Sequence, residues 1–187
     1  QYAKGHVLLQ GAPGSGKSTA MARLLLEEAE RAKDSQAPNR VVAGNARVAA
    51  VNATVVDQKA LAIPVLVELR YYDKSLPRLI EDGLKRHDPS LDVSELEYWL
   101  RQGRLLLLLD GVNELPSKAA QKDLRHFRLR YEKTTAMVFT TRELGVGGDL
   151  DIATKLKMQP LSESQMQNFV QAYLRGQSKA MLTQLGN

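Results

Sequence analysis

The feature that most restricts the fold of this chain is a glycine-rich stretch between an apolar segment and an amphipathic one. The stretch covers residues 11–19, reads GAPGSGKST, and fits the phosphate-binding pattern G-x-x-x-x-G-K-[ST]. Residues 6–10 read as a short buried strand and residues 18–32 as a helix. A chance match within a glycine-rich turn is the alternative. The strand before it and the helix after it favour a true phosphate-binding loop.

The residue types of this loop suit a polyanionic ligand. Gly11, Gly14 and Gly16 allow backbone conformations that a Cβ would forbid, so that successive N–H groups can point inward around phosphates. The helix that follows adds unpaired N–H groups and the positive end of its dipole. We expect Lys17 to contact the β- and γ-phosphates and Ser18 to bind Mg²⁺. The predicted nucleotide-binding residues are Gly11, Ala12, Pro13, Gly14, Ser15, Gly16, Lys17, Ser18 and Thr19.

Five consecutive leucines, residues 105–109, predict a strand buried on both faces, as in a parallel sheet covered by helices. Apolar runs and amphipathic periods elsewhere predict alternating strands and helices. The further strands are expected at 63–70, 137–142 and 153–158, and the further helices at 75–86, 94–103, 116–131 and 162–175. This order predicts an α/β fold, a three-layer αβα P-loop NTPase with a mostly parallel sheet of about five strands. Residues 33–62 lack a clear period and are expected to form an insertion or a loosely ordered segment.

Polar residues follow two of the predicted strands, where ligands bind in open parallel sheets. Asp110 comes directly after the leucines and is expected to hold Mg²⁺, with a solvent-exposed strand end as the alternative. Glu114 is placed to act as general base on an attacking water. Arg142 ends another strand and is expected to contact the γ-phosphate, with Thr140 or Thr141 as a weaker partner. Each of these could instead be an ordinary loop or salt-bridging residue.

Composition excludes some classes of protein and leaves others open. The chain has no cysteine, which rules out disulfides and thiolate chemistry and fits a cytoplasmic location. The longest apolar run is too short to cross a membrane, and no leader is visible, so no membrane role is expected. The net charge of +5 comes from scattered basic residues, which makes nucleic acid an unlikely partner on charge alone.

Three segments together resemble one family: GAPGSGKST, LLLLLDGVNELP and VFTTR. This combination resembles the NACHT ATPases of the STAND class of P-loop NTPases, with the first segment as Walker A and the second as Walker B. The shorter matches IPVLVELR and residues 159–162 also resemble that family, and the likeness covers about residues 5–175. The family often has a second acid just before the final Glu, where this chain has Asn113. Glu114 is then the single candidate base, and we expect slow hydrolysis.

The resemblance implies a nucleotide-controlled switch within a larger signalling or defence protein. Such proteins bind ATP or dATP, hold ADP at rest, and form homo-oligomers when activated. Their sensor repeats and effector domains are not found in this chain, which we expect to be a single core domain over residues 1–187. Residues 160–187 would begin a truncated helical lid, and the base would be contacted near residues 2–5.

Other functions remain as alternatives. The main one is a nucleotide-binding oligomerisation platform with little or no hydrolysis. A P-loop kinase would need an acceptor pocket and an arginine-rich lid, and residues 125–130 are the only lid-like run. A nucleic-acid motor has only the net positive charge in its favour. The chain lacks the Asn-Lys-x-Asp motif of GTPases, which favours ATP.

Overall fold

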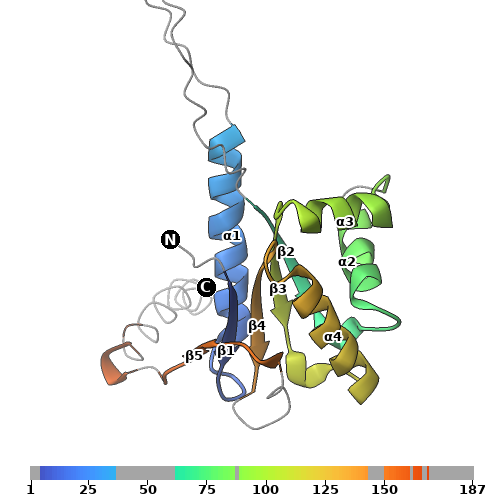
Figure 1. The fold of residues 1–187 in the computed structure, drawn as a ribbon. Helices are drawn as coiled ribbons and strands as arrows, with labels where there is room; N and C mark the ends of the chain where they lie inside the picture. The colour runs from blue at the N-terminus through green and yellow to red at the C-terminus, as the bar shows by residue number, and fades with distance from the viewer. Residues whose placement is uncertain are drawn as a thin grey trace, which may run out of the picture.

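The computed structural model describes residues 5–36, 62–86, 89–142, 150–160, 162–165 and 168. In this part of the chain, five parallel strands form one sheet in the order β2-β3-β4-β1-β5 (Figure 1). The strands are β1 (His6–Gln10), β2 (Ile63–Glu68), β3 (Leu105–Asp110), β4 (Ala136–Thr141) and β5 (Thr154–Lys157). Because all strands are parallel, their carboxyl ends meet at one edge of the sheet, the lower edge in Figure 1.

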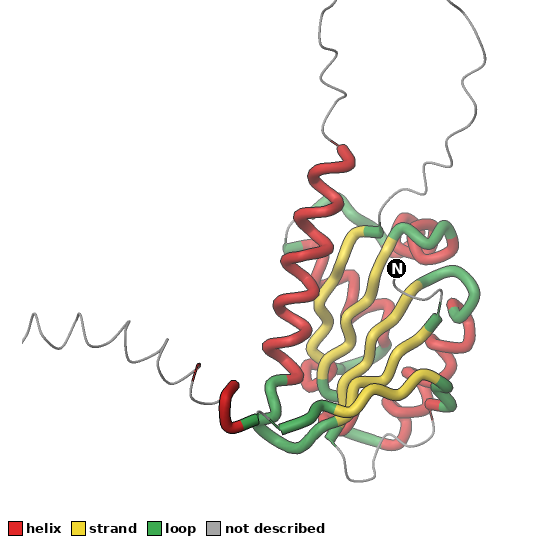
Figure 2. Tube along the Cα trace, turned by 90° about the vertical axis from the view of Figure 1, so that its left-hand side faces the viewer, coloured by secondary structure: helices red, strands yellow, loops and turns green. Residues whose placement is uncertain are grey.

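Helices cover the two faces of the sheet. Helix α1 (Lys17–Gln36) lies on one face, and α2 (Leu76–Lys85), α3 (Val93–Arg101) and α4 (Lys118–Tyr131) lie on the other (Figures 1 and 2). From β1 to β4, each strand is separated from the next by one or two helices, as parallel neighbours require. The predicted three-layer αβα fold with a mostly parallel sheet is therefore confirmed.

The core is built around β3, the leucine-rich strand. Leu105, Leu107, Leu108 and Leu109 are fully buried because β3 lies between β2 and β4 and has helices on both sides. Helices α2, α3 and α4 add apolar side chains to the same cluster; among them are Leu76, Ile80, Leu96, Leu100, Leu124 and Phe127. This packing fixes β3 firmly, so the residues that follow it start from a rigid strand end.

The ends of the helices differ slightly from the prediction. Ser75 and Ser117 are the N-caps of α2 and α4, so α2 begins at Leu76 instead of residue 75 and α4 at Lys118 instead of residue 116. Helix α3 begins at Val93 instead of residue 94, because Asp92 is its N-cap and accepts from the Glu95 N–H at 2.8 Å. Aspartate is a favourable N-cap, because its side-chain oxygen accepts an otherwise unpaired N–H of the first helical turn. Helix α1 continues to Gln36, into the segment expected as an insertion.

Several predictions fall partly or wholly outside the described residues. These are the insertion beyond residue 36, the base-contacting region at residues 2–4 and most of the helix at 162–175. The start of that last helix is described. Ser162 accepts from the Gln165 N–H at 3.3 Å and Gln165 accepts from the Ser162 N–H at 2.9 Å, the reciprocal pair of a capping box. Within the described part of the chain, no helix is long and apolar enough to cross a membrane.

Candidate functional site

The loop after β1 has the backbone that its glycines permit. Gly14 and Gly16 have φ values of 73° and 88°, in the region that glycine adopts at little cost. Gly11 is needed for another reason, because a Cβ there would lie 2.9 Å from the Cβ of Met158, the residue after β5. Ala12, Pro13 and Gly14 are exposed to solvent. The loop thus presents an open backbone surface at the carboxyl edge of the sheet.

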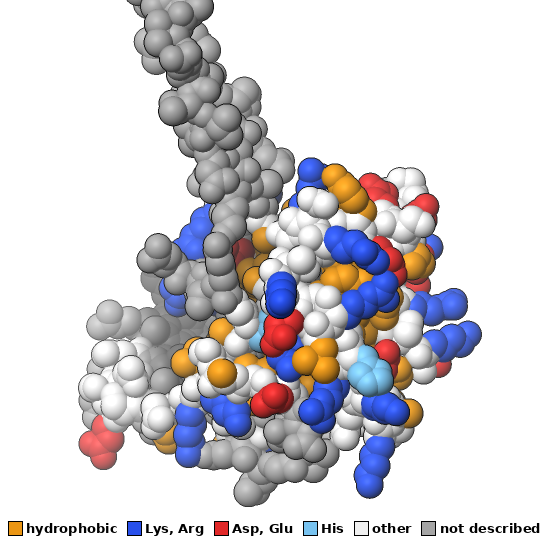
Figure 3. Space-filling model, in the orientation of Figure 1, with side chains coloured by type: hydrophobic (Ala, Val, Ile, Leu, Met, Phe, Trp, Pro, Cys, Tyr) orange, Lys and Arg blue, Asp and Glu red, His pale blue; other side chains and the backbone are white. Residues whose placement is uncertain are grey.

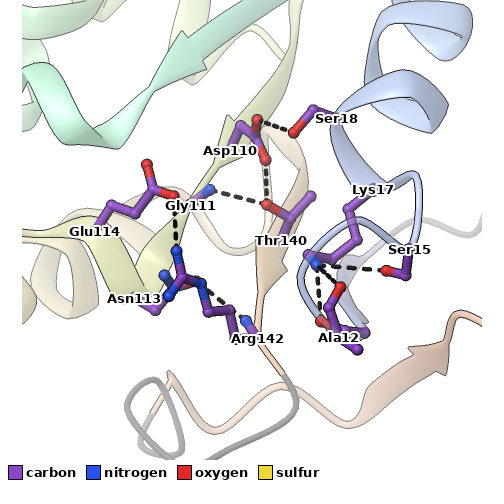
Figure 4. Close-up of polar contacts among 11 residues, drawn as sticks. Ala12, Ser15, Lys17, Ser18, Asp110, Gly111, Asn113, Glu114, Thr140 and Arg142 are labelled. Atoms are coloured by element: carbon purple, nitrogen blue, oxygen red, sulfur yellow. Dashed lines mark hydrogen bonds and ion pairs between the residues drawn. The ribbon is translucent and has the colours of Figure 1, made fainter.

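Lys17 is the first residue of α1, and its ammonium group folds over the loop (Figure 4). Its Nζ donates to the carbonyl oxygens of Gly11 at 2.7 Å and Ala12 at 2.9 Å, and lies 3.5 Å from Ser15 Oγ. The positive charge is therefore held at the mouth of the loop, beside its exposed backbone. A triphosphate placed on the loop would meet this charge, and its oxygens would compete with the two carbonyls for the ammonium group.

Ser18 and Asp110 come together although they lie far apart in the chain. The Ser18 hydroxyl donates to Asp110 Oδ2 at 2.8 Å, joining the start of α1 to the end of β3 (Figure 4). A hydroxyl and a carboxylate are hard oxygen ligands that suit Mg²⁺. The described residues contain no group of three or more His, Cys, Asp or Glu side chains arranged to hold a metal. Two protein ligands are nevertheless enough for Mg²⁺ that is also bound by phosphates and water.

Thr140 and Thr141, the two residues named as weaker partners of Arg142, are both buried at the end of β4. Thr140 is buried, donates its hydroxyl to Asp110 Oδ1, and accepts the backbone N–H of Gly111 at 2.8 Å. Thr141 Oγ1 is buried and has no hydrogen-bond partner among the described residues. Thr140 thus contacts the acid at the end of β3, and the Thr141 hydroxyl faces the interior.

A tight turn places Glu114 at the same edge. Gly111 has φ 84°, and its carbonyl accepts from the Glu114 N–H at 2.7 Å, which closes the short helical turn η2 (Val112–Glu114). The Glu114 carboxylate then lies 4.0 Å from Nη2 of Arg142, which follows β4. The backbone N–H of Arg142 donates to Asn113 Oδ1 at 3.1 Å. Asn113 therefore ties the end of β4 to the turn that carries Glu114.

Arg70 is a charged neighbour that the sequence analysis did not single out. It lies in η1 (Leu69–Tyr71), just after β2, where it pairs with Glu68. The charge of Glu68 is the largest influence raising the pKa of Arg70, and Glu114 contributes to the same rise. Glu114 is thus near Arg70 as well as Arg142. The sequence shows the charged residues Glu68 and Arg70 at the end of a predicted strand. Their place beside Glu114 follows only when β2 is known to lie next to β3.

The predicted site residues therefore meet at one edge of the sheet. In Figure 4 the loop and Lys17 lie on one side, Glu114, Asn113 and Arg142 on the other, and Asp110 and Thr140 between them. Thr19 is exposed in the first turn of α1.

A family model described as "AAA domain" matches residues 1–144, most of the chain. The chain belongs to the AAA domain family. It is an AAA-type nucleotide-binding domain with the P-loop NTPase fold, as the glycine-rich loop and the parallel sheet predicted. Comparison with the curated proteins finds no matching relative.

Solved structures with the same fold include two larger proteins. The Aeropyrum pernix ORC1 protein, solved in complex with DNA, is 19% identical with a TM-score of 0.56 over 92% of this chain and 44% of its own. PCH-2 from C. elegans is 13% identical with a TM-score of 0.51 over 96% of this chain and 42% of its own. At these identities the likeness concerns the fold. The AAA domain described above therefore spans less than half the length of either protein.

Proposed function

We propose that this AAA domain binds ATP with Mg²⁺ and hydrolyses it slowly, as the switch module of a larger signalling or defence protein of the NACHT type. The observation that carries the proposal is the 2.8 Å contact between Ser18 and Asp110. It joins two residues that are 92 positions apart in the chain, close to the loop and Lys17, and this supports their assignment as Mg²⁺ ligands. Such a meeting of a hydroxyl, a carboxylate and an ammonium group suits a magnesium-bound triphosphate.

Each residue has a role that follows from its place. The loop N–H groups and Lys17 would hold the phosphates, and Ser18 and Asp110 would hold Mg²⁺, which supplies positive charge to the phosphate oxygens. Glu114 would accept a proton from the attacking water. Arg142 would move from Glu114 to the γ-phosphate, because a phosphate carries more negative charge than one carboxylate. Glu114 is then released to act on water only when the γ-phosphate is present.

The wider role rests on the sequence resemblance. The three motifs of the NACHT proteins and the match to the AAA family both favour a nucleotide-dependent switch. We propose that the full-length protein forms homo-oligomers and carries sensor and effector domains beyond this chain. We also propose that residues 160–187 begin the helical lid over the nucleotide, and that the part of 33–62 beyond helix α1 is an insertion in the core domain.

The proposed ATPase should also be tested with nucleic acid as a partner. Figure 3 shows Lys and Arg side chains spread among acidic, apolar and polar ones on one face of the molecule. The ORC1 structure, however, contains DNA. The expectation that nucleic acid is not a partner therefore gains no support from that neighbour. Stimulation of ATP hydrolysis by DNA or RNA would identify a nucleic-acid-dependent enzyme.

The deciding experiment is calorimetry of ATP, ADP and GTP binding with Mg²⁺ to the 187-residue chain and to Lys17→Ala. We expect adenine nucleotides to bind the wild type and Lys17→Ala to bind at least about tenfold more weakly, since charge-assisted contacts to phosphate are lost. Lys122→Ala is the matched control, because Lys122 is an exposed lysine of α4 on the other face of the sheet. Equal binding by Lys17→Ala and wild type would contradict the proposed phosphate site.

A further inference from the structure

Thr140 connects three parts of the site through one buried hydroxyl. Its Oγ1 accepts the Gly111 N–H at 2.8 Å and contacts Asp110 Oδ1, while only 1% of the residue is exposed. The neighbours that it joins are Asp110, the proposed metal ligand at the end of β3, and the left-handed turn that leads to Glu114. Thr140 itself comes from the next strand of the sheet, β4.

The direction of both hydrogen bonds follows from the chemistry of the groups. A hydroxyl has one hydrogen, and a backbone N–H can only donate. Since Gly111 donates to Thr140 Oγ1, the hydroxyl hydrogen of Thr140 is free to point to the Asp110 carboxylate, which accepts it. The hydroxyl thus has one orientation instead of several, and Asp110 Oδ1 is held from the side of β4.

The second carboxylate oxygen of Asp110 is held from the opposite side. Ser18 donates to Oδ2 at 2.8 Å, so the plane of the carboxylate is fixed by hydroxyls from β4 and from α1 (Figure 4). The Ser18 oxygen keeps its lone pairs for a cation while its hydrogen points to Asp110. Removing the Thr140 hydroxyl would leave Asp110 held on one side only and Gly111 N–H without its buried acceptor.

We propose that Thr140 is a positioning residue for Mg²⁺, acting through Asp110, and that it determines how strongly nucleotide binding depends on Mg²⁺. The inference rests on the proposed function, since it assigns a further residue to the same site. Replacing a residue that hydrogen-bonds to a metal ligand typically lowers metal affinity by about ten- to a hundredfold. The hydrogen bonds of the Thr140 side chain in the described structure go to Asp110 and Gly111 and not to the glycine-rich loop, so metal-free nucleotide binding should not require it.

The chain provides a matched control at the next position. Thr141 is equally buried on the same strand, but its hydroxyl has no partner in the described structure. Thr140→Val and Thr141→Val each remove one buried hydroxyl from β4 and keep the shape of the side chain. A general effect of replacing threonine in this strand should appear in both variants. Thr140→Ser keeps the hydroxyl and should restore the behaviour of the wild type.

The test is the affinity for ADP, measured by calorimetry in EDTA and across a Mg²⁺ titration. In EDTA, we expect the affinity of Thr140→Val for ADP to lie within about twofold of the wild-type affinity. The Mg²⁺ concentration that produces the same increase in ADP affinity should be about tenfold higher than for the wild type. Thr141→Val and Thr140→Ser should follow the wild type in both conditions. If Thr140→Val does not fold, Thr140→Ala gives the same comparison.

Two results would overturn the proposal. One is an unchanged Mg²⁺ requirement in Thr140→Val. The other is an equal loss of ADP affinity in EDTA and in Mg²⁺, which would show a purely structural role. Failure of the proposed function has a different signature, because the wild type would then bind no nucleotide in either condition, and the role of Thr140 would fall with it.

Discussion

The guanidinium group of Arg142 lies 4.0 Å from the carboxylate of Glu114, between the end of β4 and the turn after β3. Both side chains are partly exposed, with 56% and 40% of their surface accessible. An exposed ion pair of this kind contributes about 0–1 kcal/mol, so the pair can separate easily when a stronger partner is present. The Arg142 backbone is held by Asn113, which leaves the side chain free to turn while the strand end stays in place.

Replacing Arg142 with alanine should therefore impair catalysis more than folding. We expect the rate of phosphate release to fall by about a hundredfold, as when one stabilising donor is removed from a reacting group. The free energy of unfolding should change by about 0.5 kcal/mol or less, as for other exposed residues. Steady-state phosphate release and chemical denaturation measure the two quantities. Arg125→Ala, an exposed arginine of α4, is the control, and equal rates in both variants would remove Arg142 from the mechanism.

Glu114→Gln separates a slow hydrolase from a platform that only binds nucleotide. The amide keeps the size of the side chain but cannot accept a proton, so we expect phosphate release to fall by about a hundredfold or more. Nucleotide affinity should be kept, because the loop and Lys17 are unchanged. Glu30→Gln, an exposed position on α1, is the control. If the wild type releases almost no phosphate and Glu114→Gln leaves this rate unchanged, the oligomerisation platform is favoured.

The sequence predicted those parts of the site that depend on neighbouring residues in the chain. The loop at 11–19 carries its own strand and helix, and Asp110 ends a strand whose five leucines indicate burial on both faces. Glu114 could be placed because only a short turn separates it from Asp110. In each case the local segment contains both the signal and the geometry.

The missed contacts depend on which strands are neighbours. Thr140 reaches Asp110 because β4 lies next to β3, and Glu68 is paired in register with Asp110 because β2 lies on the other side. A polar residue at a strand end indicates the carboxyl edge of the sheet, but it does not tell which strand it will lie beside. Thr140 and Thr141 look equivalent in the sequence. The alternation of side chains along a strand places one on the acid and the other in the interior.

Gly111→Ala should damage the turn that carries Glu114. The residue has φ 84°, where a Cβ is unfavourable by about 1–2 kcal/mol. The new Cβ would also lie 3.1 Å from the Glu114 carboxylate and displace it. We expect the free energy of unfolding to fall by about 1–2 kcal/mol, and phosphate release to fall with it because Glu114 moves.

Gly83→Ala is the matched control for this change. Gly83 lies within α2, where a Cβ would meet only Nη2 of Arg86 at 3.8 Å. Alanine should stabilise that helix by about 0.5–1 kcal/mol and leave phosphate release unchanged. Thermal and chemical denaturation measure the stability changes. A Gly111→Ala protein as stable and active as the wild type would show that the left-handed turn is not required.

Buried His6 should make folding stability depend on pH near neutrality. Its Nε2 lies 3.2 Å from the Thr135 carbonyl and must donate to it, so Nδ1 accepts from Arg128 Nη1 at 3.4 Å. Desolvation by burial, above all, lowers the pKa of His6, and the charge of Arg128 lowers it further against the opposing effects of Thr135 and Glu132. A second proton would face the Arg128 guanidinium, so the folded state keeps the ring neutral.

The sign of the effect follows from the lowered pKa. At a pH between the folded-state pKa of His6 and its unfolded value of about 6.5, His6 is mostly protonated in the unfolded chain and mostly neutral in the folded chain. Stability should thus be fully present above about pH 6.5 and decrease as the pH falls toward the folded-state pKa, by at most about 1.4 kcal/mol per pH unit. His6→Gln should remove this part of the slope in chemical denaturation between pH 5 and 8, roughly the window of histidine titration. His126→Gln, at an exposed position of α4, should retain it, and a slope unchanged in His6→Gln would contradict the prediction.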